Sequence, residues 1–146
     1  MTTVNDTIRD GSCLCRSVRF TIKGEPFHYL VCHCDNCKKA SGSAFMTNVW
    51  FKEEAFTITA GQDVLKRYQD TNTKTGKPLS RHFCSNCGSN LFLRISPDLP
   101  RSDVVIISNP AIDGGHVWKP RKESFPTERF SWIKHLEMKS KEKSKL

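Results

Sequence analysis

Short segments in which apolar and polar residues alternate recur along the chain. In residues 18–24, Val18, Phe20 and Ile22 alternate with polar neighbours and the pattern ends at Gly24, which is typical of a half-buried strand. Many short strands without long helical patterns between them predict an all-β domain. The other candidate strands are residues 43–51, 56–61, 64–69, 90–95 and 103–108.

Two segments favour helix over strand. Residues 34–41 can form one helical turn directly after a group of cysteines. Residues 127–139 predict a short C-terminal helix, with Thr127 as its N-cap and with Phe130 and Ile133 on one face.

The length of 146 residues and the ordinary composition predict one domain at residues 1–137 and a basic, disordered tail at residues 138–146. No stretch approaches the roughly 18 consecutive apolar residues of a membrane span. The N-terminus has no apolar signal segment, so we expect a cytoplasmic location, where thiols stay reduced. The formal net charge is +8, but the aromatic residues are not interleaved with the basic ones, which argues against a nucleic-acid groove.

Seven cysteines need an explanation in such a chain. They fall in three clusters, at residues 13–15, 32–37 and 84–87. The odd number, the tight spacing and the expected reducing compartment argue against disulfides. Metal ligation explains the clusters better, and zinc is the usual metal of thiolate-rich sites that have no redox task.

Spacing alone leaves two divisions of these ligands open. In the first, four cysteines close one tetrahedral site and three hold a second ion with an open position. The four are Cys13, Cys15, Cys84 and Cys87, and the three are Cys32, Cys34 and Cys37. In the second division, Cys34 and Cys37 share an ion with the 84–87 pair, which leaves three cysteines unused.

An open position matters because structural zinc sites are closed, whereas catalytic ones keep an exchangeable ligand. Lys38 and Lys39 follow the three-cysteine cluster and could offset its negative charge, although solvated lysines are equally common. Strand alternation directs His33 away from the ion. We expect the open position to face a pocket walled in part by residues 43–51, with Phe45 and Trp50 as its aromatic lining.

The segments GSCLC-RSVRF, CHCDNCKKASGSAF and RHFCSNCGSNLF resemble the glutathione-dependent formaldehyde-activating enzyme family, which also contains centromere protein V. The resemblance runs from about residue 11 to residue 132. It implies a β-tent fold of short antiparallel strands with two zinc ions, divided as in the first scheme. The implied structural ligands are Cys13, Cys15, Cys84 and Cys87, and the implied ligands of the catalytic zinc are Cys32, Cys34 and Cys37.

Two further positions bear on the resemblance. Arg129 and Trp132, in ERFSWI, match an Arg and Trp element near the family's C-terminus. Arg16 departs from the pattern, because family members often carry Gly after the first C-x-C, where a small residue allows close packing or a turn.

The resemblance implies a zinc-dependent carbon–sulfur lyase that joins glutathione to formaldehyde, so the expected partner is a small-molecule thiol or thiol adduct. A non-enzymatic, zinc-stabilised module that binds protein or nucleic acid is the alternative. The centromere branch of the family and the net charge of +8 keep that alternative open, but it ranks second to the enzyme. A third alternative is that both zinc ions are structural, with His or water as the fourth ligand at the three-cysteine site.

Overall fold

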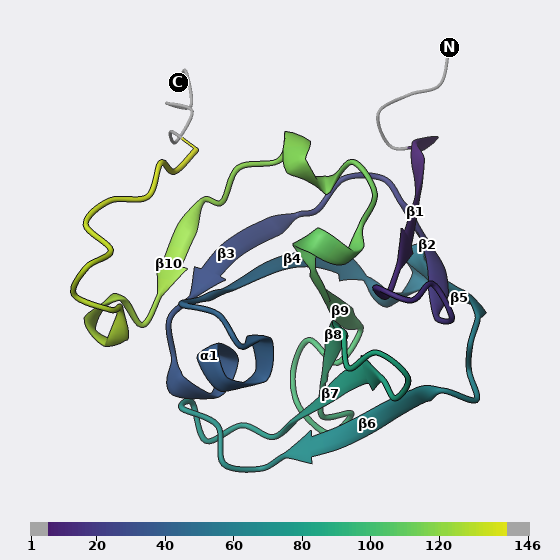
Figure 1. Cartoon of the computed structure of the whole chain (residues 1–146), viewed down its shortest axis with the longest axis horizontal. Coiled ribbons are helices and arrows are strands. Elements are labelled where there is room, and N and C mark those ends of the chain that lie inside the picture. Colours follow the sequence, from purple (N-terminus) through teal and green to yellow (C-terminus); the bar gives the residue numbers. More distant parts are fainter. Residues whose placement is uncertain (1–5, 140–146) are drawn as a thin grey trace.

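The computed structural model describes residues 6–139, apart from the side chain of His116. Its strands form two sheets (Figure 1). The smaller sheet has the order β1-β2-β5 and is antiparallel throughout. Its strands are β1 (Ile8–Ser12), β2 (Arg19–Lys23) and β5 (Phe56–Ala60).

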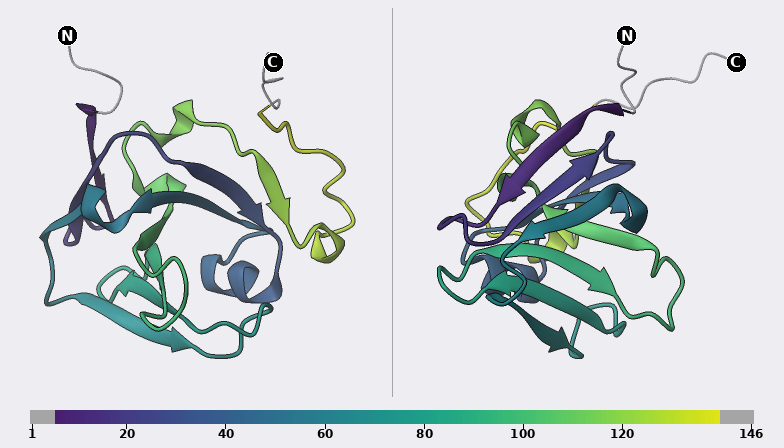
Figure 2. Two further views of the ribbon diagram at one scale, coloured as in Figure 1. Left: turned by 180° about the vertical axis from the view of Figure 1, so that it is seen from behind. Right: turned by 90° about the vertical axis from the view of Figure 1, so that its right-hand side faces the viewer.

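The larger sheet has seven strands in the order β10-β3-β4-β9-β8-β7-β6. Every neighbouring pair is antiparallel except β10 and β3, which run parallel. The strands are β3 (His28–Cys32), β4 (Met46–Lys52), β6 (Leu65–Asp70), β7 (Leu79–Cys84), β8 (Asn90–Ile95), β9 (Val104–Ser108) and β10 (Lys122–Ser124). Figure 2 shows this sheet curving from one edge to the other.

Within the described residues there is one α-helix, α1 (Asp35–Ser41), which confirms the helical turn expected after the cysteines. It lies between β3 and β4 on one side and β6 and β7 on the other (Figure 1). The described residues also contain four short 3-10 helices: Glu53–Ala55, Asn109–Ala111, Gly115–Val117 and Pro126–Glu128. No helix in residues 6–139 is long and apolar enough to cross a membrane.

The all-β expectation is confirmed, and each of the six candidate segments overlaps a strand. Alternation along these strands gives the large sheet two different faces. Val49 and Phe51 of β4 face a core shared with the small sheet. Met46, from the same strand, faces a second cluster that contains the thiols of residues 32–37. The strand β9 is buried on both faces, as its continuous apolar run predicts.

The C-terminal helix predicted for residues 127–139 is wrong. Thr127 lies inside the 3-10 turn Pro126–Glu128, and no helix follows it up to Lys139. Tertiary contacts replace helical bonds, because Lys38 Nζ donates to the Glu128 carbonyl at 2.7 Å. Short helices are marginal without such support. Of the predicted tail, residues 140–146 lie outside the described residues, and the Lys139 amide donates to the Pro120 carbonyl at 2.8 Å.

Gly61, at the end of β5, is required by both conformation and space. Its φ is +83°, and a Cβ built there would lie 2.2 Å from the Ser17 carbonyl oxygen. Gly76 has a similar φ of +73° but open space around it. Substitutions at Gly61 and Gly76 therefore distinguish the two effects, because both would strain the backbone but only a side chain at Gly61 would also clash with a neighbour.

We predict that Gly61→Ala lowers the free energy of unfolding by about 2–4 kcal/mol, since left-handed strain and overpacking add. The control Gly76→Ala should lower it by about 1 kcal/mol, from strain alone. Denaturant unfolding measures both values, and equal losses at the two positions would contradict the close contact at Ser17.

Candidate metal centres and their pocket

The first cysteine group joins two distant turns. Cys13 and Cys15 lie after β1, and Cys84 and Cys87 form a turn at the end of β7. All four Sγ atoms lie within 4.8 Å of one another. Two of the sulfur–sulfur distances are 3.6 Å, between Cys13 and Cys15, and 3.8 Å, between Cys15 and Cys84. The structure thus gathers the four thiols that the first division assigns to one ion.

Local backbone geometry prepares this group for a cation. The Val18 amide donates to Cys13 Sγ at 3.3 Å. The Gly88 amide donates to the Cys84 carbonyl at 2.8 Å, and Gly88 takes a φ of +74° to close the turn. A hydrogen bond from the Ser89 hydroxyl lowers the pKa of Cys87 to about 5, whereas burial raises that of Cys84 to about 11. Four converging sulfurs, some held as thiolates, fit a tetrahedral thiophilic ion.

The second group is formed by Cys32, Cys34 and Cys37. Cys32 ends β3, Cys34 is the N-cap of α1, and Cys37 lies in the first turn of that helix. The Cys37 amide donates to Cys34 Sγ at 3.4 Å, and Cys32 Sγ lies 3.4 Å from Cys34 Sγ. Each residue is only 6% exposed. Among the described side chains, which exclude that of His116, no His, Asp or Glu joins these three thiols as a fourth ligand.

The three thiols share charge unequally. Hydrogen bonds from Cys32 and Cys37 lower the pKa of Cys34 to about 2. The neighbouring thiol of Cys34, followed by that of Cys37 and by burial, raises the pKa of Cys32 above its usual range. The thiol protons of Cys32 and Cys37 therefore stabilise a thiolate at Cys34 by hydrogen bonds, so the cluster carries negative charge at neutral pH. A metal ion that replaces those protons would fit the same donor set.

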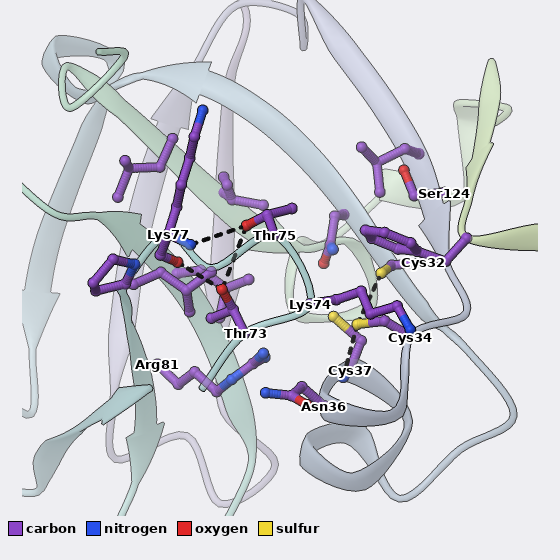
Figure 3. Close-up of a pocket in the computed structure, with 18 of the residues that line it drawn as sticks. Cys32, Cys34, Asn36, Cys37, Thr73, Lys74, Thr75, Lys77, Arg81 and Ser124 are labelled. Carbon is purple, nitrogen blue, oxygen red and sulfur yellow. Dashed lines mark hydrogen bonds between the residues drawn. The ribbon is translucent and has the colours of Figure 1, made fainter. Parts of the chain in front are cut away.

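A buried ion pair adjoins this cluster, and no local sequence pattern predicts it. Arg81 on β7 is 6% exposed and donates from Nε to Asp70 on β6 at 2.8 Å. Asn36, in α1, donates to both carboxylate oxygens of Asp70, at 3.2 and 3.1 Å. Figure 3 shows the Arg81 side chain directed toward Asn36 and the sulfurs. Arg81, rather than Lys38 or Lys39, is thus the cation placed to offset the thiolates.

The pKa directions agree with this arrangement. Burial lowers the pKa of Arg81, but the hydrogen bond to Asp70 and the charge of Cys37 outweigh it and raise the pKa overall. Burial raises the pKa of Asp70, but hydrogen bonds from Arg81 and Asn36 outweigh it and lower the pKa. Both groups stay charged at neutral pH.

The flanking lysines and His33 point elsewhere. Lys38 packs 4.5 Å from the centre of the Phe130 ring and bonds the C-terminal segment. Lys39 is exposed. His33 is fully buried, and its Nε2 lies 2.9 Å from the Glu123 carboxylate on β10. His33 therefore faces away from the three sulfurs, as strand alternation predicts.

A pocket of about 500 Å³ opens beside the three thiols. Asn48 and Trp50 of β4 line it, which places residues 43–51 in its wall as predicted. Phe45 does not line it, so that expectation is wrong. Phe45 has the opposite parity to Trp50 along the chain, so its ring lies on the other side and packs 5.8 Å from the ring of His33.

Comparison with known proteins identifies the family. The sequence profile described as glutathione-dependent formaldehyde-activating enzyme matches residues 8–128. The chain belongs to that family. A relative from Halomonas elongata, named "putative glutathione-dependent formaldehyde-activating enzyme", is 31% identical over 58% of this chain and 54% of its own. A relative of the same name from Fusarium vanettenii is 31% identical over 60% of this chain and 46% of its own.

The chain thus spans about half the length of the curated relatives it matches. A crystal structure of a Rhodobacter sphaeroides protein aligns with a TM-score of 0.58 at 16% identity, over 79% of this chain and 99% of that one. At that identity the likeness concerns the fold alone.

The structure places Arg16 and the C-terminal element, the two positions singled out by the resemblance. Arg16 has a φ of +62°, a left-handed value that Gly adopts without strain. Its amide still closes the turn by donating to the Cys13 carbonyl at 3.0 Å. Arg129 lies 3.3 Å from Glu123, the partner of His33, whereas Trp132 is 69% exposed and stacks on Phe130.

We predict that Arg16→Gly raises the free energy of unfolding by up to about 1 kcal/mol, because relief of left-handed strain exceeds the added chain entropy. The variant should melt at a higher temperature than the wild-type protein. A fall in melting temperature would show that the Arg16 side chain contributes more than its backbone strain removes.

We predict that Asp70→Asn destabilises the protein by about 3 kcal/mol, because it leaves the buried Arg81 charge without its partner. Asp103→Asn is the control, since Asp103 pairs with Lys52 in an exposed ion pair at 2.6 Å. That change should have little measurable effect on thermal unfolding. Similar losses for the two variants would contradict the structural role assigned to the buried pair.

Proposed function

We propose that the chain is a zinc-dependent enzyme of the carbon–sulfur lyase type. Its substrate is an adduct of glutathione or another thiol with a small electrophile such as formaldehyde. The observation that carries the proposal is the group of three thiols beside a pocket of about 500 Å³, with no fourth protein ligand in residues 6–139. A pocket of that size suits a small organic molecule.

The two cysteine groups have different roles in this proposal. The first group holds a closed structural zinc through Cys13, Cys15, Cys84 and Cys87. The second holds the catalytic zinc through Cys32, Cys34 and Cys37. A zinc ion with an open position supplies a Lewis acid that lowers the pKa of a bound thiol or polarises a carbonyl.

The addition of a thiol to formaldehyde forms one carbon–sulfur bond and breaks the carbonyl π bond, and the thiol proton ends on the former carbonyl oxygen. The Arg81 guanidinium offsets the negative charge near the sulfurs throughout. Ser124, which pairs in register with Cys32, offers a hydroxyl to the substrate oxygen (Figure 3). Among the described residues, no His, Asp or Glu lines the pocket, so the proton passes through solvent or hydroxyl groups.

The alternative of a non-enzymatic binding module is supported less well. A module needs only the closed four-cysteine group for stability. It gives no reason for a second, incomplete thiol group that lines a pocket together with a buried arginine. The cytoplasmic location stays a prediction.

We predict two zinc equivalents in the wild-type chain and one in Cys32→Ala, whose fold should persist. That variant should lose turnover by at least about 100-fold, because its metal site no longer has three thiolates. Cys84→Ser should instead leave the domain poorly folded, because structural zinc binding supplies folding energy. Metal analysis, circular dichroism and NMR exchange rates of glutathione with formaldehyde test all three variants.

Formaldehyde adds to thiols unaided, so the exchange rate without protein is subtracted as background. Zinc content of one equivalent in the wild type would contradict the two-site proposal. Activity retained in Cys32→Ala would contradict the catalytic role of the second group.

A further inference from the structure

The pocket has an unusual charge balance. Four cationic side chains line it and no acidic one does. These are Lys74, Lys77, Arg81 and Arg101. Arg81 pairs with Asp70, and Lys74 pairs with Glu128. Within the described residues, the side chains of Lys77 and Arg101 have no such partner, and both are exposed. The two unpaired cations therefore favour an anionic group on the ligand.

Arg101 is also held in a restricted conformation. Its φ is +67°, a left-handed value that strains the backbone of a non-Gly residue. The residue before it, Pro100, also lines the pocket. An arginine thus stands at this border at a position where glycine would be less strained.

The wall between the thiols and these cations is largely apolar. It follows the inner face of the large sheet through cross-strand neighbours. Trp50 on β4 is in register with Ile106 on β9, which is in register with Leu93 on β8. Leu79 on β7 is in register with Ile95 on β8. All of these side chains line the pocket. A ligand that reaches from the sulfurs to the cations must cross this apolar band.

Two polar atoms interrupt the band. Asn48 is 5% exposed and lines the pocket, and its Oδ1 has no hydrogen-bond partner in the described residues. The buried Nε1 of Trp50 likewise has no partner there. Glutathione would bring two amide groups, two carboxylates and an ammonium into this space. One acceptor and one donor can pair with only part of two amides, and each amide group left without a partner against leucine and isoleucine side chains opposes binding. A hydrocarbon chain carries no such penalty and gains from burial.

We propose that the pocket selects thiols with an apolar body and a single carboxylate at the end remote from sulfur, in preference to glutathione. The sulfur lies at the three-cysteine site, the hydrocarbon on the band, and the carboxylate at Lys77 and Arg101. The placement of the ligand sulfur at the three-cysteine site rests on the proposed function. The apolar and anionic parts rest on the pocket itself.

The test is calorimetric titration of the zinc-loaded full chain with 6-mercaptohexanoate, 6-mercaptohexanol and glutathione. We expect 6-mercaptohexanoate to bind about tenfold more tightly than glutathione, since no amide is desolvated. It should bind about fivefold more tightly than the neutral alcohol, because it alone meets the two cations. Glutathione binding as tightly as 6-mercaptohexanoate would overturn the proposal.

Variants locate the two halves of the ligand. Lys77→Ser combined with Arg101→Gly should abolish the preference for the acid over the alcohol, whereas the control Arg19→Ser, on the small sheet, should preserve it. Ile95→Thr should weaken both chain ligands about threefold or more and leave glutathione unchanged. Circular dichroism checks the fold of each variant. An acid preference that survives loss of both cations would place the carboxylate elsewhere and overturn the assignment.

Heptanoate and 1-heptanol, which have no thiol, separate this inference from the proposed function. If heptanoate is preferred and no variant-sensitive carbon–sulfur chemistry is found, the pocket assignment stands and the enzyme proposal falls. If glutathione adducts are formed catalytically but heptanoate and 1-heptanol bind equally, the enzyme proposal stands and the pocket assignment falls.

Discussion

The accumulation of negative charge on three buried thiols is the constraint on which the rest of the structure depends. Cys32, Cys34 and Cys37 lie too close together, and too far from water, for all three to ionise without compensation. A bound metal ion would neutralise most of that charge, and the Arg81 guanidinium neutralises part of the remainder. Arg81 is itself too buried to remain unpaired, so Asp70 is required, and Asp70 in turn is held by Asn36 from the helix that carries two of the thiols.

The same loop is fixed from its other side. His33, between two of the thiols, bonds Glu123, and Glu123 is held by Arg129. The parallel pairing of β10 with β3 brings this carboxylate into place, and the His33 amide donates to the Ser124 carbonyl at 3.0 Å. Two series of hydrogen-bonded side chains, one on each side of the loop, therefore position the cysteines so that their sulfurs border the pocket.

The sequence pattern predicted those elements whose formation depends on neighbouring residues, and missed those that depend on distant contacts. Alternation located β2 and β5, and a run that is apolar on both faces located β9. In each case the polarity of adjacent residues shows which face of the strand is buried. The strand β10 is Lys-Glu-Ser and has no such pattern, since pairing with β3 alone makes it a strand. Cysteine spacing identified the candidate ligands but left open how they divide between two ions. No pattern near Arg81 in the sequence predicts that it pairs with Asp70 or lies beside the three thiols. The C-terminal helix failed because Lys38, far away in the chain, takes the Glu128 carbonyl.

Long sequence separations affect the order of events during synthesis. In the four-cysteine group, Cys13 emerges 71 residues before Cys84. The three-cysteine loop is local in sequence, but its His33 emerges 90 residues before Glu123, to which it bonds. Neither thiol group can therefore reach its final surroundings until most of the chain has left the ribosome, and pairings of such high sequence separation form slowly. The nascent chain carries uncovered thiols during that time, so metal ions that bind thiolates would meet them before the fold is complete.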